Sequence, residues 1–489
     1  MTLSSVLAKN TTYLTISSIA QKALAFVWYV YVTQQLNEET LGEYTFAISF
    51  TSIFVIVMNF GFIPLLTRDG AKEPTKLQQT FNSIISTKLI LTLVSIGLLI
   101  AVFQGLNYYN PQSQYTVMLV YLATGIIIFD TFRSTIFAVL RAQQRMQYEA
   151  IGQFLYQVAV AVTGTICFAF GYKAGGLILA INVASILFLL YAIVILIKKT
   201  DIRWQWQWQW RTVWQLCLVA APFALADIFF RLNGSIDTVM LKYLAGNRYV
   251  AWYNIAQKLT VTLSIIPGMF ATAFFPVMSQ AIAQSREALR DIFERSTSIL
   301  FIFSAPLAIG SIVLAPSIIN VAFKSYPAAI PALQIFMVSL IFMFANYPIG
   351  NALNAANRQL LNTVNMLIAL LFNIVLNVLL IPQYTYIGAA VAAVASTIAL
   401  PLLGLPYIYQ MTRFRVGWLL KKLMLTISAA LGMGAVVWYL QLILPETKAM
   451  FGVMLLAGIL SYGILVLLVR AVTLTELRQL WTAIKPSRS

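Results

Sequence analysis

The sequence predicts an all-α integral membrane protein with about fourteen transmembrane helices. Of its 489 residues 60% are apolar and only 10% are charged, whereas a soluble domain carries roughly 25% charged residues. Apolar runs of about 20 residues recur from end to end, and each is long enough to cross ~30 Å of hydrocarbon. The Lys and Arg residues gather in alternate short loops between these runs. We therefore expect one membrane domain without a separate soluble domain.

Each apolar run is interpreted as an α-helix, because backbone amides in lipid must be paired within their own segment and the runs are too long for barrel strands. The predicted helices lie near residues 11–33, 44–66, 82–103, 115–139, 150–170, 175–197, 213–243, 250–275, 296–315, 330–353, 363–381, 387–408, 423–444 and 450–469.

The distribution of positive charge predicts the topology. With the N-terminus in the cytoplasm, inside segments hold 22 Lys and Arg residues and outside loops hold five. The positive-inside rule then places both termini in the cytoplasm. The outside loops are short, which leaves no room for an extracytoplasmic domain.

An internal repeat divides the chain. Leu140, Ala142 and Arg145 recur as Leu353, Ala355 and Arg358, and Gly175 recurs as Gly388, all at an offset of 213. Six helices in each half make the repeats parallel, with a central site between them. The predicted organisation is an N-terminal lobe at 1–200, a cytoplasmic linker at 201–212, a C-terminal lobe at 213–409, and two further helices with a cytoplasmic tail at 410–489.

The composition excludes several classes of site. The chain has no His and two Cys, Cys167 and Cys217, both inside apolar runs, so a zinc site and a disulfide framework are excluded. The net charge of +17 could indicate nucleic acid, but the cations lie in membrane loops. In the linker, Trp and Gln alternate from Trp204 to Arg211, which is typical of an aromatic anchor at the membrane interface.

Charged residues deep in the predicted helices are candidates for function, because each costs at least ~2.5 kcal/mol in lipid unless it faces protein or water. Lys22 lies in the middle of the first helix, and an offset of 209 places Arg231 at the matching point of the seventh. We expect these two cations to face each other and to bind substrate. Lys258 and Arg133 are further candidates for substrate binding, although Arg133 is near enough to a helix end to extend toward the interface.

Three carboxylates accompany these cations. Asp227 lies one turn before Arg231, Asp130 lies one turn before Arg133, and Asp237 follows a predicted helix break at Asn233 and Gly234. They are candidates for coupling transport to a proton or sodium gradient, and the alternative is that the pairs only neutralise each other. Lys88 is interpreted as an interfacial residue whose side chain extends to the headgroups.

Several segments resemble the polysaccharide-transporter family. The stretch SIDTVMLKYLAGNRYVAWYNIAQKL from Ser235 is similar to the family's seventh and eighth helices. The stretches ALNAANRQ, FNIVLNVLLIPQY and IGAAVAAVAS between Asn351 and Ser396 resemble its tenth to twelfth helices, and AFKSYPAAIPALQIF from Ala322 resembles the preceding loop. This resemblance implies membership of the multidrug, oligosaccharidyl-lipid and polysaccharide exporter superfamily, close to its O-antigen and exopolysaccharide repeat-unit flippases.

The resemblance implies a flippase that moves polyprenyl-diphosphate-linked oligosaccharides to the outer leaflet of a bacterial cytoplasmic membrane. Its partners would be this lipid, membrane lipids and other polysaccharide assembly proteins, with no enzymatic activity, no nucleic acid and no cofactor besides a coupling ion. A peptidoglycan lipid-precursor flippase and a multidrug antiporter on the same fold are the alternatives, followed by a polyprenyl-dependent polymerase or glycosyltransferase. A cationic drug requires an acidic or aromatic cavity, whereas the predicted cavity has more cations than carboxylates.

Overall fold

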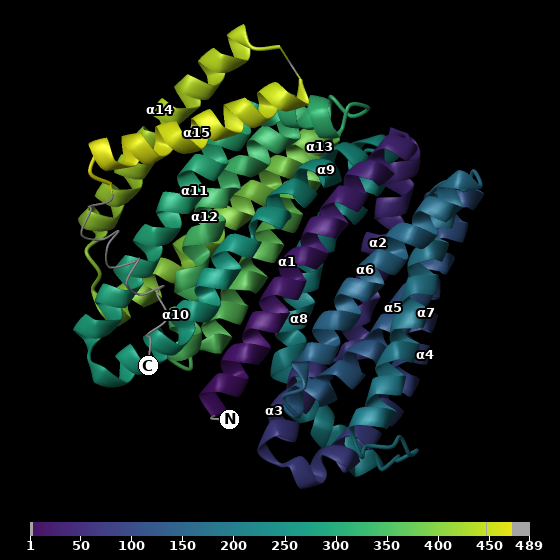
Figure 1. The fold of residues 1–489 in the computed structure, drawn as a ribbon. Helices are drawn as coiled ribbons and strands as arrows, with labels where there is room; N and C mark the ends of the chain where they lie inside the picture. Colours follow the sequence, from purple (N-terminus) through teal and green to yellow (C-terminus); the bar gives the residue numbers. More distant parts are fainter. Residues whose placement is uncertain (1–2, 446, 472–489) are drawn as a thin grey trace. The chain divides into compact units, whose positions relative to one another are not determined.

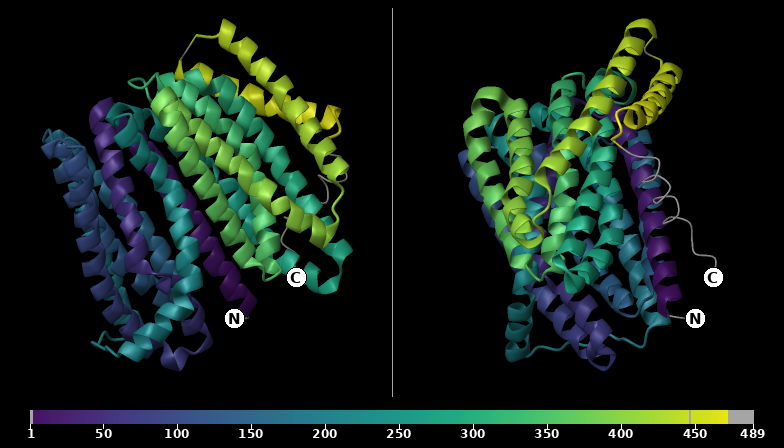
Figure 2. Two further views of the ribbon diagram at one scale, coloured as in Figure 1. Left: turned by 180° about the vertical axis from the view of Figure 1, so that it is seen from behind. Right: turned by 90° about the vertical axis from the view of Figure 1, so that its left-hand side faces the viewer.

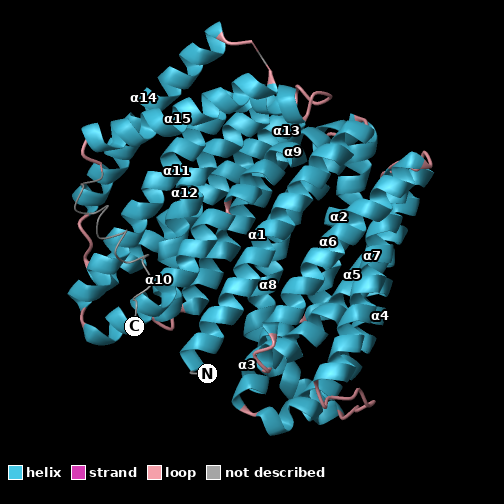
Figure 3. Ribbon diagram, viewed as in Figure 1, coloured by secondary structure: helices cyan, strands magenta, loops and turns pink. Residues whose placement is uncertain are grey.

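The computed structural model describes residues 3–445 and 447–471 and confirms the all-α class (Figure 3). The predicted cytoplasmic tail beyond residue 471 lies outside the described residues. The chain forms two compact units, Met1–Ala251 and Trp252–Ser489. Within the described part of both units the regular elements are helices, and no strand is present.

The helices are coloured along the chain in Figure 1 and shown from two further sides in Figure 2. In order they are α1 (Leu3–Gln35), α2 (Glu38–Asn59), α3 (Phe62–Lys72), the short 3-10 helix η1 (Pro74–Lys76), α4 (Leu77–Tyr109), α5 (Gln114–Ala142), α6 (Met146–Ala169), α7 (Ala174–Lys199), α8 (Trp210–Leu244), α9 (Asn247–Leu263), α10 (Ile265–Gln284), α11 (Arg286–Ala322), α12 (Ala329–Ala355), α13 (Gln359–Thr412), α14 (Val416–Ile443) and α15 (Lys448–Leu468).

Eleven helical segments of the described chain are long and apolar enough to cross a membrane, or twelve when the bent α8 counts as one span. The protein is therefore a multi-pass membrane protein. The number fourteen stays a prediction, because α13 is counted as a single span although it covers two predicted helices.

α13 is interrupted at Thr385. This residue has φ 51° and ψ −128°, which is not helical, and it separates the segments predicted at 363–381 and 387–408. A β-branched residue rarely adopts positive φ. Three residues further on, a Cβ on Gly388 would lie 2.4 Å from the backbone oxygen of Leu380, so glycine permits the close approach of the two segments.

Replacing Thr385 by glycine should stabilise the protein by about 1 kcal/mol, because the backbone strain of a non-glycine residue at this φ is relieved. The measurement is thermal unfolding in detergent. Thr397→Gly, in the regular part of the same helix, should instead destabilise by roughly 0.5 kcal/mol, because glycine is a poorer helix former than threonine. Equal destabilisation by both variants would show that the break carries no strain.

The predicted internal repeat is visible in the local geometry of both units. The chain leaves α5 through Gln144 (φ 59°) and leaves α12 through Asn357 (φ 58°), at the predicted offset of 213. The amides of Arg145 and Arg358 donate to the carbonyls five residues earlier, each at 2.8 Å. Both helices thus end in the same left-handed turn, which satisfies their last carbonyls.

α8 packs against α2 in the first unit. The Ser52 and Ser235 hydroxyls are 2.9 Å apart, and the ring centroids of Phe46 and Tyr243 are 5.7 Å apart. The sequence predicts that this helix belongs to the C-terminal lobe, which begins at residue 213. The division of the chain into functional lobes stays a prediction.

The break in α8 is not where the sequence predicted it. The segments Trp210–Leu225 and Asp227–Leu244 meet at 42°, whereas the chain is helical through Asn233 and Gly234. The bend follows Pro222 by about one turn, and proline lacks the backbone N–H that donates a hydrogen bond in a helix. It therefore lies beside Asp227 and not beyond Arg231.

The Trp and Gln linker is extended and runs along the first turns of α4. Backbone amides at alternate linker residues donate to side chains at every fourth position of α4, because two extended residues and four helical residues advance by similar lengths. The three bonds are Arg203 to Gln78 (2.9 Å), Gln205 to Asn82 (3.1 Å) and Gln207 to Ser86 (3.1 Å). Trp204, Trp206 and Trp210 are exposed, which accords with the interfacial anchor that the sequence predicts.

Candidate functional site

A polar cavity of about 310 Å³ lies inside the first unit, between α2, α3, α5 and α8. Two arginines, Arg133 and Arg231, and one carboxylate, Asp130, line it. Its neutral polar lining residues are Thr51, Ser52, Asn59, Thr131 and Ser134. Polar groups are rare inside membrane proteins and mark substrate or ion pathways. This cavity is therefore the candidate site.

Arg231 enters the cavity from α8, just after the bend of that helix. Its Nε donates to Asp227 Oδ2 at 2.9 Å, one turn earlier. Both side chains are 30% exposed, so the pair is accessible. A guanidinium has five N–H donors, and the bond to Asp227 uses the Nε donor. The remaining donors suit the oxygens of a phosphate group.

Arg133 is held inside the unit on α5. Its guanidinium lies 3.0 Å from Asp130 Oδ1 and 4.4 Å from the centroid of the Phe188 ring. Ser185 donates to the same carboxylate at 3.3 Å. The Nε of Arg133 is buried without a hydrogen-bond partner in the structure. Arg133 thus packs on an aromatic ring and borders the cavity.

The structure contradicts the interfacial position that the sequence predicts for Lys88. Its side chain is fully buried on α4, and the structure does not place it at the interface. The ammonium donates to Asn59 Oδ1 at 2.8 Å, to the Thr131 carbonyl at 3.0 Å and to Thr135 Oγ1 at 2.6 Å. Three acceptors match the three protons of an ammonium, so this buried cation is satisfied without a carboxylate bonded to it.

The charges around the cavity do not cancel. Lys88, Arg133 and Arg231 are cations, and Asp130 and Asp227 are the carboxylates paired with the two arginines. Lys88 bonds Asn59 and Thr131, which both line the cavity, so its charge lies directly behind the cavity wall. With all five groups ionised, the formal charge around the cavity is plus one, and a positive charge beside a partly buried cavity attracts an anion.

The other predicted site residues lie elsewhere. Lys22 is exposed on α1 and is not among the lining residues of this cavity. Lys258 is exposed on α9 and belongs to the second unit. Asp237 is buried on α8 with 3% of its surface exposed, outside the lining. The structure thus brings Arg133, Asp130 and Arg231 together, with Asp227 paired to Arg231, and leaves the roles of the other three as predictions.

No group of three or more metal-ligating side chains occurs among the described residues.

Comparison with known proteins relates this fold to membrane transport. Residues 7–282 match the model of the family described as polysaccharide biosynthesis protein, and residues 222–379 match the MatE model. A probable low-salt glycan biosynthesis flippase, Agl15, of Haloferax volcanii is 22% identical over 485 residues, 97% of this chain and 98% of that protein. The capsular polysaccharide biosynthesis protein CapF of Staphylococcus aureus is 18% identical over 395 residues, covering 80% of this chain and 96% of its own.

Solved structures share the fold. The lipid II flippase MurJ, in an inward closed conformation, matches with a TM-score of 0.70 and 18% identity over 92% of this chain and 97% of its own. An inward-facing multidrug resistance transporter of the MATE family matches with a TM-score of 0.66 and 16% identity, over 80% and 96%. The exporter fold predicted from the sequence is confirmed. The relatives include archaeal and bacterial proteins, so they do not restrict the chain to bacteria.

Proposed function

Because this chain belongs to the polysaccharide biosynthesis protein family, we propose that it is a flippase for polyprenyl-diphosphate-linked oligosaccharides. It moves them from the cytoplasmic to the outer leaflet by alternating access, as a transporter and not as an enzyme. Two relatives that are named for glycan or capsule biosynthesis, aligned over at least 80% of this chain, support the class of substrate.

The observation that carries the proposal is the net positive cavity of the first unit. A diphosphate can leave water only where cations replace its hydration, because an unpaired charge in a medium of low dielectric is very costly. Arg231 and Arg133 offer guanidinium groups at the cavity wall, and Lys88 supplies a positive charge behind it. Lys22 and Lys258 are proposed to bind the same substrate at other points of the cycle.

The carboxylates give the site a means of coupling. Asp130 and Asp227 each hold one of the cavity arginines, so a proton or sodium ion that neutralises either carboxylate frees its arginine for the substrate. We propose that Asp130, Asp227 and Asp237 couple flipping to such a gradient. The protein is proposed to lie in the cytoplasmic membrane with both termini inside and to work beside other polysaccharide assembly proteins.

A peptidoglycan lipid-precursor flippase is the nearest alternative, because MurJ has the same fold and is named a lipid II flippase. A multidrug antiporter is a further alternative, supported by the MATE-family structure. The net positive charge of the cavity disfavours a cationic drug. A polyprenyl-dependent polymerase or glycosyltransferase is not favoured by any residue around the cavity.

Reconstitution into vesicles tests the proposal. The measurement is the fraction of a polyprenyl-diphosphate oligosaccharide that becomes accessible to a glycan-modifying enzyme outside the vesicles. Vesicles with the protein should expose inner-leaflet substrate at a rate well above protein-free vesicles. Transport of a cationic drug without any flipping of the lipid-linked oligosaccharide would support the antiporter instead. Flipping of a peptidoglycan lipid precursor alone would support the second alternative.

A further inference from the structure

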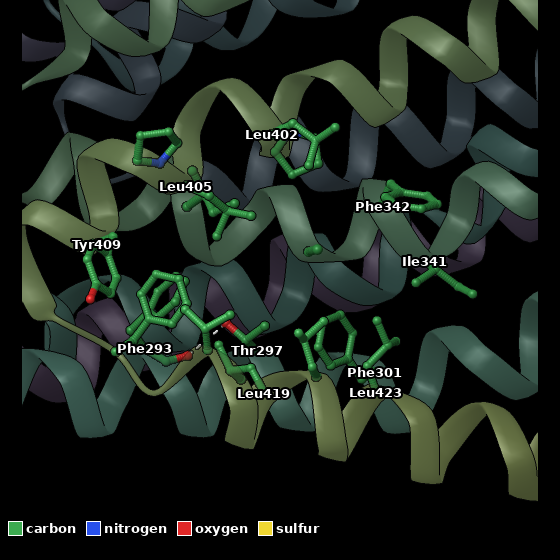
Figure 4. Close-up of a pocket in the computed structure, with 17 residues that line it drawn as sticks. Phe293, Thr297, Phe301, Ile341, Phe342, Leu402, Leu405, Tyr409, Leu419 and Leu423 are labelled. Atoms are coloured by element: carbon green, nitrogen blue, oxygen red, sulfur yellow. Dashed lines mark hydrogen bonds between the residues drawn. The ribbon is translucent and has the colours of Figure 1, made fainter.

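A second cavity, of about 510 Å³, lies inside the second unit between α11, α12, α13 and α14 (Figure 4). It is separate from the polar cavity, whose lining belongs to the first unit. Its volume is in the range of small-molecule sites. Pro401 and Pro406 of α13 line it, and neither has a backbone N–H to donate a helical hydrogen bond.

The lining is apolar apart from Thr297 and Tyr409. The Thr297 hydroxyl donates to the Phe293 carbonyl of its own helix at 2.8 Å, shown as the dashed line in Figure 4. Water needs several polar partners to occupy a buried cavity, and this one offers few. Phe293, Phe301 and Leu405 instead present hydrocarbon to whatever enters. The chemistry of the wall therefore fits an aliphatic chain.

The cavity opens on the surface of the unit along α13 and α14. Four lining residues are strongly exposed: Leu402 (57%), Leu420 (52%), Val416 (46%) and Tyr409 (40%). In a chain that crosses the membrane, an apolar opening between transmembrane helices is accessible to lipid.

Two arginines without a carboxylate partner lie at one end of this opening, in the part of the chain that the structure describes. Arg413 is exposed and its guanidinium lies 5.2 Å from the centroid of the Tyr409 ring, which lines the cavity. Arg286 donates to the carbonyls of Met411 and Gln410 at the end of α13, at 3.2 and 2.7 Å. A third arginine, Arg415, is neutralised by Glu294, with Nη2 to Oε2 at 2.5 Å.

We propose that this cavity binds one acyl chain of an anionic phospholipid of the surrounding bilayer, with the lipid phosphate on Arg413. The topology that the positive-inside rule predicts has this end of the helices at the cytoplasmic leaflet, whose surface is anionic. A guanidinium pairs with phosphate through parallel hydrogen bonds, and the cavity begins beside it. The bound lipid fastens α14 to α11 and α13, and it is a structural ligand and not the transported substrate.

Thermal unfolding of the purified full chain in detergent tests this site. Phosphatidylglycerol should raise the Tm by about 3 °C more than phosphatidylcholine at the same concentration, as expected of a ligand that binds the folded state. Arg413→Gln should remove most of this difference because the phosphate loses its partner. Ala345→Phe should abolish it, because the new ring fills the cavity that Ala345 lines.

Two matched variants serve as controls. Arg295→Gln removes an exposed arginine of α11 that does not line the cavity, and Leu455→Phe adds a ring at the separate apolar cavity of about 440 Å³ between α10, α11, α14 and α15. Both should keep the difference in Tm between the two lipids, and far-UV circular dichroism identifies any variant that does not fold.

The proposal is overturned if wild type responds equally to the two lipids, or if Arg295→Gln loses as much as Arg413→Gln. It is also overturned if Ala345→Phe folds and keeps the full difference, or if polyprenyl phosphate stabilises the protein and phosphatidylglycerol does not. Each result is independent of flipping, so failure of the flippase assay and failure of this site are distinguishable.

Discussion

Replacing Arg231 by glutamine is expected to slow flipping of a polyprenyl-diphosphate oligosaccharide by at least about thirtyfold. Loss of one partner of a desolvated charge pair costs about 2 kcal/mol or more, and 1.4 kcal/mol corresponds to tenfold. Arg231 is the cation that the bend in α8 presents to the polar cavity, and its removal leaves Asp227 facing an anionic substrate. The measurement is the initial rate of leaflet exchange in vesicles.

The double variant Asp227→Asn with Arg231→Gln separates the functional role from a structural one. If the two residues only neutralise each other, removing both should restore flipping to near the wild-type rate, because no charge is left unpaired. If Arg231 binds the diphosphate, the double variant stays slow. Arg231→Lys should be intermediate, since the charge is kept but the parallel hydrogen bonds are lost.

Replacing Lys88 by methionine is expected to destabilise the protein by about 3 kcal/mol. A hydrogen bond from a charged group contributes about 1.5–3 kcal/mol, and the variant removes the bonds to Asn59, Thr131 and Thr135. Part of this cost is offset because methionine is apolar and of similar length. The measurement is the unfolding temperature in detergent, together with the flipping rate per molecule of folded protein.

Lys22→Met is the matched control, since Lys22 is also a lysine of a transmembrane helix but is exposed. It should change the unfolding temperature little. If both variants lower the unfolding temperature equally, or if Lys88→Met does not lower it, the role of Lys88 as the buried positive charge behind the cavity wall is refuted.

The fold was predictable because its signal is repeated many times. Each long apolar run predicts a helix independently, and the repeat at an offset of 213 reappears as matching left-handed turns at Gln144 and Asn357. Positions of breaks were less predictable. Asn233 and Gly234 weaken a helix locally, but Pro222 removes a backbone bond, and the observed bend lies closer to the proline.

The site was predictable only in part, because depth along a helix does not determine which way a side chain points. Asp130, Arg133 and Arg231 reach one cavity, whereas Lys22 at comparable depth is exposed. Lys88 was assigned to the interface because it lies near a predicted helix end. α4 begins five residues before that predicted helix, at Leu77, so Lys88 lies deeper in the helix than expected. Its partners Asn59, Thr131 and Thr135 come from two other helices, and a single sequence does not show their convergence.

An electron cryo-microscopy structure with a bound polyprenyl-diphosphate oligosaccharide would show directly where the diphosphate binds. We expect density for the diphosphate within hydrogen-bonding distance of Arg231 in the polar cavity, with the Arg231–Asp227 bond lengthened or broken. Diphosphate density that contacts neither Arg231 nor Arg133, while the cavity holds only water, would refute the polar cavity as the substrate site.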